Sequence, residues 1–213
     1  MRIILLLAIA LLPQLINAQK VFEGFVNYQI EYLSVPDEVK GFESMLPQEM
    51  TKYMSGSKMR VEQTIMGEGT QIVISDSDAN TGTVLMNVLG TQIAMVIDGD
   101  EMADAKEEKK KQKVKITKET KKIAGYKCKK AIVEMEGMDA PVIVWFTNEF
   151  KSSIEDYNKI DGLVLSYTSL AEGMQMRLTA EVVQKEGVDS SMFEIPDGYD
   201  VVTQDELMKM FGQ

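Results

Sequence analysis

The residue types that most often carry out catalysis are scarce in this sequence. It contains no histidine, and Cys128 is its only cysteine. Without histidine, the chain lacks the commonest general base, the usual zinc ligand and the ordinary Ser or Cys triad. A lone cysteine is more often a small buried apolar residue than a reactive thiol. We therefore predict a protein with no catalytic residue, no metal site and no cofactor.

One motif could still supply a nucleophile. Residues Ser55–Lys58 (SGSK) fit the pattern S-x-x-K, in which a lysine activates a serine for acyl transfer. The companion signatures S-D-N and K-T-G are absent, and Gly56 is explained more simply by a hairpin turn. A hydrolase that uses Ser55 and Lys58 is therefore the weakest of our three functional hypotheses.

The acidic residues of Asp76–Asn80 (DSDAN) have the spacing of a calcium loop. An EF-hand would also need glycine at the position of Thr81 and glutamate at the position of Asn87. Because both of these residues are missing, we predict a solvated turn at this place.

Methionine is frequent, with 16 residues in the chain. Thioethers can bind Cu(I), but such sites usually contain histidine or paired cysteines as well. Methionine also fills irregular apolar space and adapts to ligands of varied shape. We therefore interpret the methionines as core filling or as the lining of an adaptable pocket.

Charge is strongly segregated along the chain. The whole sequence has a net charge of −10, yet residues 106–130 contain 12 Lys against 3 acidic residues. The acidic remainder would repel the phosphates of nucleic acids, so we predict no nucleic-acid partner. The basic band is the candidate docking surface for an anionic membrane or an acidic protein, through Lys109, Lys110, Lys111, Lys113 and Lys115. The alternative is a solvated edge whose lysines prevent association between sheets.

The first residues have the organisation of a secretory signal. Arg2 precedes the apolar run Ile3–Leu12, and a c-region ends at Ala18, the predicted cleavage site. The apolar run is too short to span a bilayer. We predict a signal peptide at 1–18 and a single domain at 19–213. The mature protein would be soluble and exported, either periplasmic or extracellular, and a single cysteine permits no internal disulfide.

Most of the remaining chain consists of short runs in which apolar and polar residues alternate. Gly-containing turns at eight-to-twelve-residue spacing predict an antiparallel meander, sandwich or barrel. We predict a short amphipathic helix after the first strand (21–33), with Phe42 and Leu46 on its apolar face, and a C-terminal helix capped by Thr203 and Glu206. Residues 98–113 are either an exposed helix or a flexible loop.

The stretch Lys121–Phe146 joins a basic strand to the most apolar strand through a Gly/Pro turn. The alternation changes phase within it, because Cys128 lies on one parity and Val133 on the other. A bulge near Lys129 and Lys130 would allow both sets to face the core, and bulges curve sheets.

Several motifs, in this order along the chain, resemble an exported bacterial family of unknown function that is grouped with the lipoprotein carriers LolA and LolB. They are F-x-G-x-V-x-Y (22–28), K-M-R-V-E (58–62), E-T-K-K-I-A-G-Y-K-C-K-K (119–130), V-W-F-T (144–147) and F-E-I-P-D-G-Y (193–199). The resemblance implies a strongly curved antiparallel sheet, an incomplete LolA-like barrel, with helices that close its concave mouth. In the carriers, that hollow holds acyl chains.

These observations lead to a mainly β (α+β) protein that is not an enzyme and that binds an apolar ligand, a lipid or lipoprotein acyl chain, in a concave hollow. The predicted lining is Tyr28, Ile30, Val133, Met135, Met176 and Leu178, with Phe42 and Leu46 on the helical lid. The alternative is a structural or interaction protein of the cell envelope with a filled core, which docks an acidic partner or membrane through its lysine band.

Overall fold

Twelve strands form one open sheet in the computed structural model, which describes residues 20–65, 69–88, 90–97, 99–138, 140–152, 154, 156–171, 173–203 and 206. The strand order is β12-β6-β5-β4-β3-β2-β1-β11-β10-β9-β8-β7, and the β12–β6 pair alone is parallel among these described strands. The mainly β prediction is confirmed. The strands are β1 (Gly24–Ser34), β2 (Glu49–Ser55), β3 (Lys58–Ile65), β4 (Gly69–Asp76), β5 (Thr81–Val88), β6 (Thr91–Ile97), β7 (Lys113–Ile123), β8 (Tyr126–Glu134), β9 (Val142–Thr147), β10 (Leu163–Ala171), β11 (Met174–Lys185) and β12 (Asp200–Val202).

The predicted amphipathic helix after β1 is wrong. Two short 3-10 turns, η1 (Asp37–Val39) and η2 (Glu43–Met45), stand in its place. Gly41, which has a φ of +88°, separates them, and this left-handed conformation interrupts a right-handed helix. Phe42 is 57% exposed, so the segment does not bury an apolar helical face.

The ends of the chain are described only in part. The predicted signal peptide lies outside the described residues, and so does all of the predicted C-terminal helix except Glu206. The predicted capping box is confirmed, because the Thr203 backbone N–H donates to Oε2 of Glu206 at 2.8 Å and the Glu206 N–H donates to Oγ1 of Thr203 at 3.3 Å. None of the described helices is long and apolar enough to cross a membrane.

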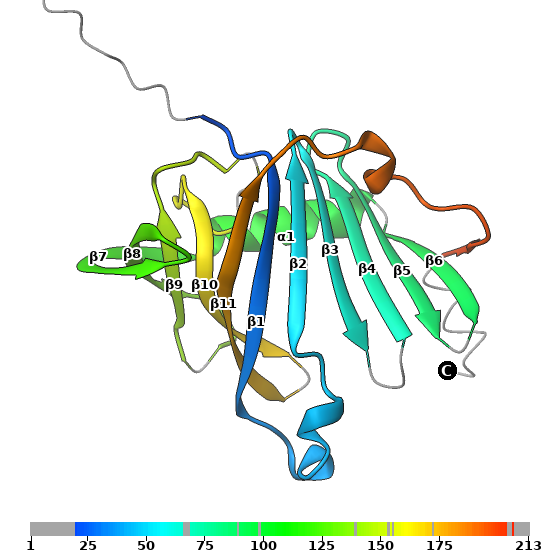
Figure 1. The fold of residues 1–213 in the computed structure, drawn as a ribbon, viewed down its shortest axis with the longest axis horizontal. Coiled ribbons are helices and arrows are strands. Elements are labelled where there is room, and N and C mark those ends of the chain that lie inside the picture. The colour runs from blue at the N-terminus through cyan, green and yellow to red at the C-terminus, as the bar shows by residue number, and fades with distance from the viewer. Residues whose placement is uncertain are drawn as a thin grey trace, which may run out of the picture.

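The helix α1 (Gly99–Lys111) decides between the two alternatives for residues 98–113 in favour of an exposed helix, and none of its residues is buried. Figure 1 shows it running across one face of the sheet. In the middle of the helix, Lys106 donates to the Ser77 carbonyl at 3.2 Å and to Oδ1 of Asn80 at 2.7 Å. Polar contacts rather than apolar burial therefore hold the helix there.

The phase change in β8 is real, and an irregularity lies beside Lys130 as predicted, in the pairing of β8 with β7. The pairing of β8 with β9 is continuous through Lys129 and Lys130, so no bulge is inserted between these two strands. The irregularity lies in β7, between Ile116 and Thr120. Cys128 and Val133 are both fully buried, and they belong to separate apolar clusters. The residues that alternate with Cys128 thus pack in one cluster, and those that alternate with Val133 pack in the other.

The opposite face of the β3–β6 half is covered by the segment that follows β11. It contains the short turn η3 (Ser190–Phe193), whose Phe193 packs with Ile74, Leu85 and Ala94. Arg60 anchors the segment because its Nη1 donates to the Met192 carbonyl at 2.8 Å. The closing F-E-I-P-D-G-Y motif therefore has a structural role, since it covers this part of the sheet.

Candidate binding groove

A groove lies under the C-terminal end of α1, on the sheet face that the helix crosses. Its inner part is a cavity of about 210 Å³, which has room for roughly seven waters at ~30 Å³ each. The lining comes from the three strands β1, β2 and β10, from the residues that directly follow α1 and β8, and from the loop before β10. It consists of Tyr28, Lys52, Gln112, Met135, Asp156, Tyr157, Val164 and Tyr167.

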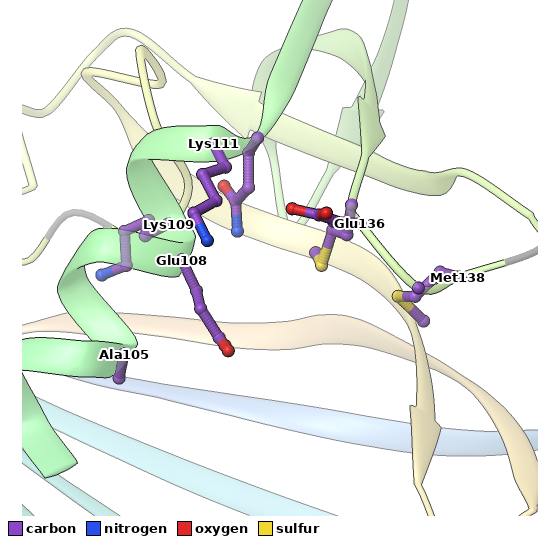
Figure 2. A pocket seen from close by; sticks show the side chains of 9 residues that line it. Ala105, Glu108, Lys109, Lys111, Glu136 and Met138 are labelled. Carbon is purple, nitrogen blue, oxygen red and sulfur yellow. The ribbon is translucent and has the colours of Figure 1, made fainter.

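The outer part is a larger cavity of about 480 Å³ between α1 and the turn from β8 to β9. Figure 2 shows Glu108, Lys109 and Lys111 on the helix side and Glu136 and Met138 on the opposite side. Gln112 and Met135 line both cavities, so the two spaces are neighbours. The outer volume lies within the ~300–1,000 Å³ usual for ligand sites.

A third space of about 160 Å³ continues the groove toward the turn between β10 and β11. It shares Gly137 and Met138 with the outer cavity, and Leu170, at the far end, is 57% exposed. The three spaces are therefore neighbours, with Met135 between the inner and outer ones and Met138 between the outer and third ones.

The floor contains an ion pair between Lys52 and Asp156. The Nζ of Lys52 lies 2.5 Å from Oδ1 of Asp156, and Lys52 is only 7% exposed. Lys52 is buried because it follows the apolar parity of β2, between Met50 and Met54. The opposite charges cancel, so the floor is polar but carries no net charge. A buried charge that loses its partner is strongly destabilising.

Three tyrosines complete the floor. The Tyr28 hydroxyl donates to the Val164 carbonyl at 2.7 Å, and the rings of Tyr28 and Tyr167 meet edge to face at 6.0 Å between centroids. Tyr157 meets Tyr167 in the same way at 6.5 Å. Burial raises the pKa of all three hydroxyls, and the carboxylate of Asp156 raises them further. All three therefore remain neutral hydroxyls at physiological pH, with the O–H of Tyr28 already donated to Val164.

Asn158 fastens the end of α1 over this floor. Its backbone N–H donates to Oε1 of Gln112 at 3.1 Å, and its Nδ2 donates to the Lys110 carbonyl at 3.1 Å. Because Gln112 also lines both the inner and the outer cavity, its side chain stands at the boundary between them. The contact with Asn158 thus positions the residue that separates the two spaces.

The predicted lining residues divide into two groups. Tyr28 and Met135 line the inner cavity. The others lie elsewhere: Ile30, Leu178 and Met176 pack in the cluster around Tyr28, Val133 fills the cluster beside Met135, Leu46 is buried away from α1, and Phe42 is exposed.

Sequence reasoning missed Lys52, Gln112, Asp156, Tyr157 and Tyr167. The sequence did contain one indication, because Lys52 is a charged residue that alternates with the apolar Met50 and Met54. Asp156 and Tyr157 lie in a stretch that reads only as a polar turn.

The predicted docking lysines are spread along α1 and β7. Lys109 and Lys111 line the outer cavity, and Lys110 lines a separate space of about 360 Å³ that also includes Ile154 and Asn158. Lys110 also pairs with Glu107 at 2.5 Å. Lys113 and Lys115 are exposed at the beginning of β7.

The segment Ser55–Lys58 is a hairpin turn between β2 and β3. Gly56 has a φ of +56°, and Ser55 and Lys58 face each other in the strand register. The Ser55 hydroxyl donates to Oε1 of Glu23 at 3.1 Å. The turn interpretation of Gly56 is confirmed.

The segment Asp76–Asn80 is a turn closed by Asp76 itself. Oδ1 of Asp76 accepts from the Ser57 hydroxyl at 2.8 Å and from the N–H of Asp78 at 3.0 Å. These hydrogen bonds, first that of Ser57, lower the pKa of the carboxyl. The carboxylate is thus engaged by the turn, and within the described residues no group of three or more acidic, Cys or His side chains is arranged to hold a metal.

Comparison with known proteins finds similarity over part of the chain to an N-glycanase domain. The family model described as N-glycanase peptide, N-terminal domain, matches residues 87–190, which include α1 and the groove strands β8, β9 and β10. Two structures of PNGF-II, in space groups P21 and C2, have TM-scores of 0.53 and 0.52 at 19% and 18% identity. At this identity they show a shared β-rich fold.

The comparison with PNGF-II covers 89% and 88% of this chain but only 33% and 32% of the PNGF-II chains, so the chain spans about a third of their length. The crystal structure of MucB has a TM-score of 0.34 at 10% identity, and the match covers 82% of this chain and 58% of MucB. That score is too low for an argument about the fold. No curated protein matches the chain.

Proposed function

We propose that this chain is a non-catalytic, exported binding protein that holds an apolar chain with a neutral polar head in the groove under α1. The observation that carries the proposal is the polarity gradient along the groove. Methionine side chains line its middle, and a polar floor without net charge closes its inner end. Ligand pockets typically combine apolar side chains with a few fixed polar groups, and the inner cavity combines Met135, Val164 and three tyrosine rings with the Lys52–Asp156 pair.

The polar floor favours a neutral head over a charged one. A ligand anion near Lys52 would also meet the carboxylate of Asp156, and a cation near Asp156 would meet the ammonium of Lys52. Hydroxyl and amide groups can instead accept from Tyr157 or Tyr167 and donate to the carboxylate, and an ester can accept from the tyrosines. The outer space and Met138 would hold the apolar part, such as an acyl chain of the kind that LolA-like carriers hold.

Native mass spectrometry of protein purified from its own host tests this proposal. We expect a lipid-sized adduct on the intact protein. Met135→Trp should remove the adduct because Met135 is shared by the inner and outer cavities. Met45→Trp is the matched control, since Met45 is 54% exposed in η2. A wild-type protein that carries no lipid, with both variants folded, would contradict the proposal.

The family match favours a second candidate function. The matched model is the N-terminal domain of an N-glycanase, so this chain would assist recognition of glycoproteins without performing the cleavage. The hydroxyls and the ion pair of the floor are also suited to a sugar. Binding of N-glycopeptides that disappears in Tyr167→Phe, together with the absence of lipid, would favour this candidate over the first.

A further inference from the structure

The hairpin of β7 and β8 separates its side chains into two different faces. On one face Ile123 and Cys128 are buried, and Tyr126 packs edge to face on Phe150 at 5.3 Å between ring centroids. On the other face Lys122, Lys127 and Lys129 are all exposed. The first face fixes the hairpin to the body of the protein, so the second presents its lysines on a supported surface.

The register places these lysines together. Lys122 lies directly opposite Lys127, and Lys129 follows two residues later on the same face, opposite Thr120. Like charges that face each other across a strand pair destabilise the sheet. None of the three lysines forms an ion pair with another described residue.

The other charges of the hairpin are already engaged or distant. Glu119 is the only acidic residue of β7, and both of its carboxylate oxygens accept from Lys130, at 3.0 and 3.1 Å. Lys121 lies over the Trp145 ring, 4.4 Å from its centroid. Lys121 and Lys130 thus have partners on the packed face, and the triad formed by Lys122, Lys127 and Lys129 does not.

We propose that the triad of Lys122, Lys127 and Lys129 docks the protein on a membrane surface of anionic phospholipids. Ile116 lies on the next rung of the same face, and its side chain is 49% exposed. An exposed apolar side chain beside cations is suited to the headgroup region, where the cations meet phosphates. Figure 1 shows the hairpin projecting at one end of the sheet, where a flat surface can reach it.

A membrane fits this surface better than an acidic protein. The triad is a small patch on a strand face, and none of the cavities described above includes it. Stable protein partners bury about 800 Å² on each side with complementary shape. Dispersed headgroups need no shaped groove. The acidic remainder of the chain would turn the hairpin toward an anionic surface.

The test is sedimentation of the full chain with vesicles of phosphatidylcholine alone and of phosphatidylcholine mixed with phosphatidylglycerol. We expect binding to the mixed vesicles only, weakened by added salt. K122Q/K127Q/K129Q should weaken it roughly a hundredfold, from about a fivefold loss for each lysine removed near the surface. K113Q/K115Q/K118Q is the control, because it removes the same charge from the same hairpin away from the triad.

Three results would overturn the proposal: no binding to mixed vesicles, equal losses in the two variants, or triad-dependent binding to acidic proteins without binding to vesicles. Thermal unfolding separates docking from a role in the fold. The triad variant should have a Tm no lower than that of the wild type, because it removes repulsion between Lys122 and Lys127. A clearly lowered Tm together with lost binding would also overturn the proposal.

Discussion

Lys52 and Asp156, 104 residues apart in the sequence, form an ion pair of 2.5 Å that joins β2 to the loop before β10. Lys52 is 7% exposed, so its ammonium depends on this carboxylate. Asp156→Ala leaves the buried charge without a partner and should lower the free energy of unfolding by about 3 kcal/mol.

The double variant Lys52→Met/Asp156→Ala is the control for this effect. It removes both charges, so most of the stability lost in Asp156→Ala should return. Urea denaturation of the two variants measures the difference. A double variant as unstable as the single one would show that the pairing of charges is not the cause.

Tyr28 makes the buried hydrogen bond of the groove floor. Tyr28→Phe leaves the Val164 carbonyl without its donor and should cost about 1–2 kcal/mol in unfolding free energy. Tyr32→Phe is a matched control, since the Tyr32 hydroxyl donates to the Pro47 carbonyl at 2.8 Å in a less buried place where water can replace it. An equal loss of unfolding free energy in the two variants would show that the greater burial of the Tyr28 hydrogen bond does not increase its contribution.

Because Cys128 is buried, we expect the free energy of unfolding to fall at alkaline pH. Burial raises the pKa of its thiol to about 11, against about 8.5 in an unfolded chain. The folded state keeps the proton that the unfolded state releases, so stability should fall as pH rises from about 9 to 11. The loss should reach up to about 2 kcal/mol at the upper end.

Cys128→Ala removes this contribution to the pH dependence. Urea denaturation at pH 8, 9, 10 and 11 should therefore give a shallower decline for the variant than for the wild type. The raised pKa of the three floor tyrosines acts in the same direction in both proteins. Parallel curves, or rapid reaction of native Cys128 with a maleimide at pH 8, would contradict the prediction.

We expect Asn158 to stabilise the C-terminal end of α1 locally. Asn158→Gly removes the hydrogen bond to the Lys110 carbonyl, and amide hydrogens of the last helical turn should then exchange several-fold faster. Strands β1 and β11 should keep their protection. Asn80→Gly removes the contacts at the other end of the helix and should accelerate exchange there instead. Uniform acceleration throughout the protein would mean that Asn158 acts on global stability.

The alternation of apolar and polar residues correctly predicted strands of this sheet. In β1 the buried residues Val26, Tyr28 and Ile30 follow period two, as expected of a strand with one wet face. The helical spacing of Phe42 and Leu46 misled, because Gly41 and the flanking prolines determine the local backbone.

The groove could not be derived in the same way. Lys52 was visible as a charge on an apolar parity, but its partner lies in a different part of the chain. Asp156 and Tyr157 occupy a loop without periodicity, and Asp156 reaches Lys52 of β2 although β1 and β11 lie between β2 and β10 in the sheet. Contacts at such separations follow from strand order, which the alternation of residues does not specify.

The position of the single tryptophan has a further consequence, for spectroscopy. Trp145 is covered by Lys121 of the basic hairpin, whereas Tyr28, Tyr157 and Tyr167 stand at the floor of the groove. Tryptophan emission is therefore a signal from the hairpin, and the ultraviolet absorbance of the tyrosines contains a signal from the groove. The unlabelled chain carries an optical reporter for each of its two surfaces, and a titration can follow both in one cuvette.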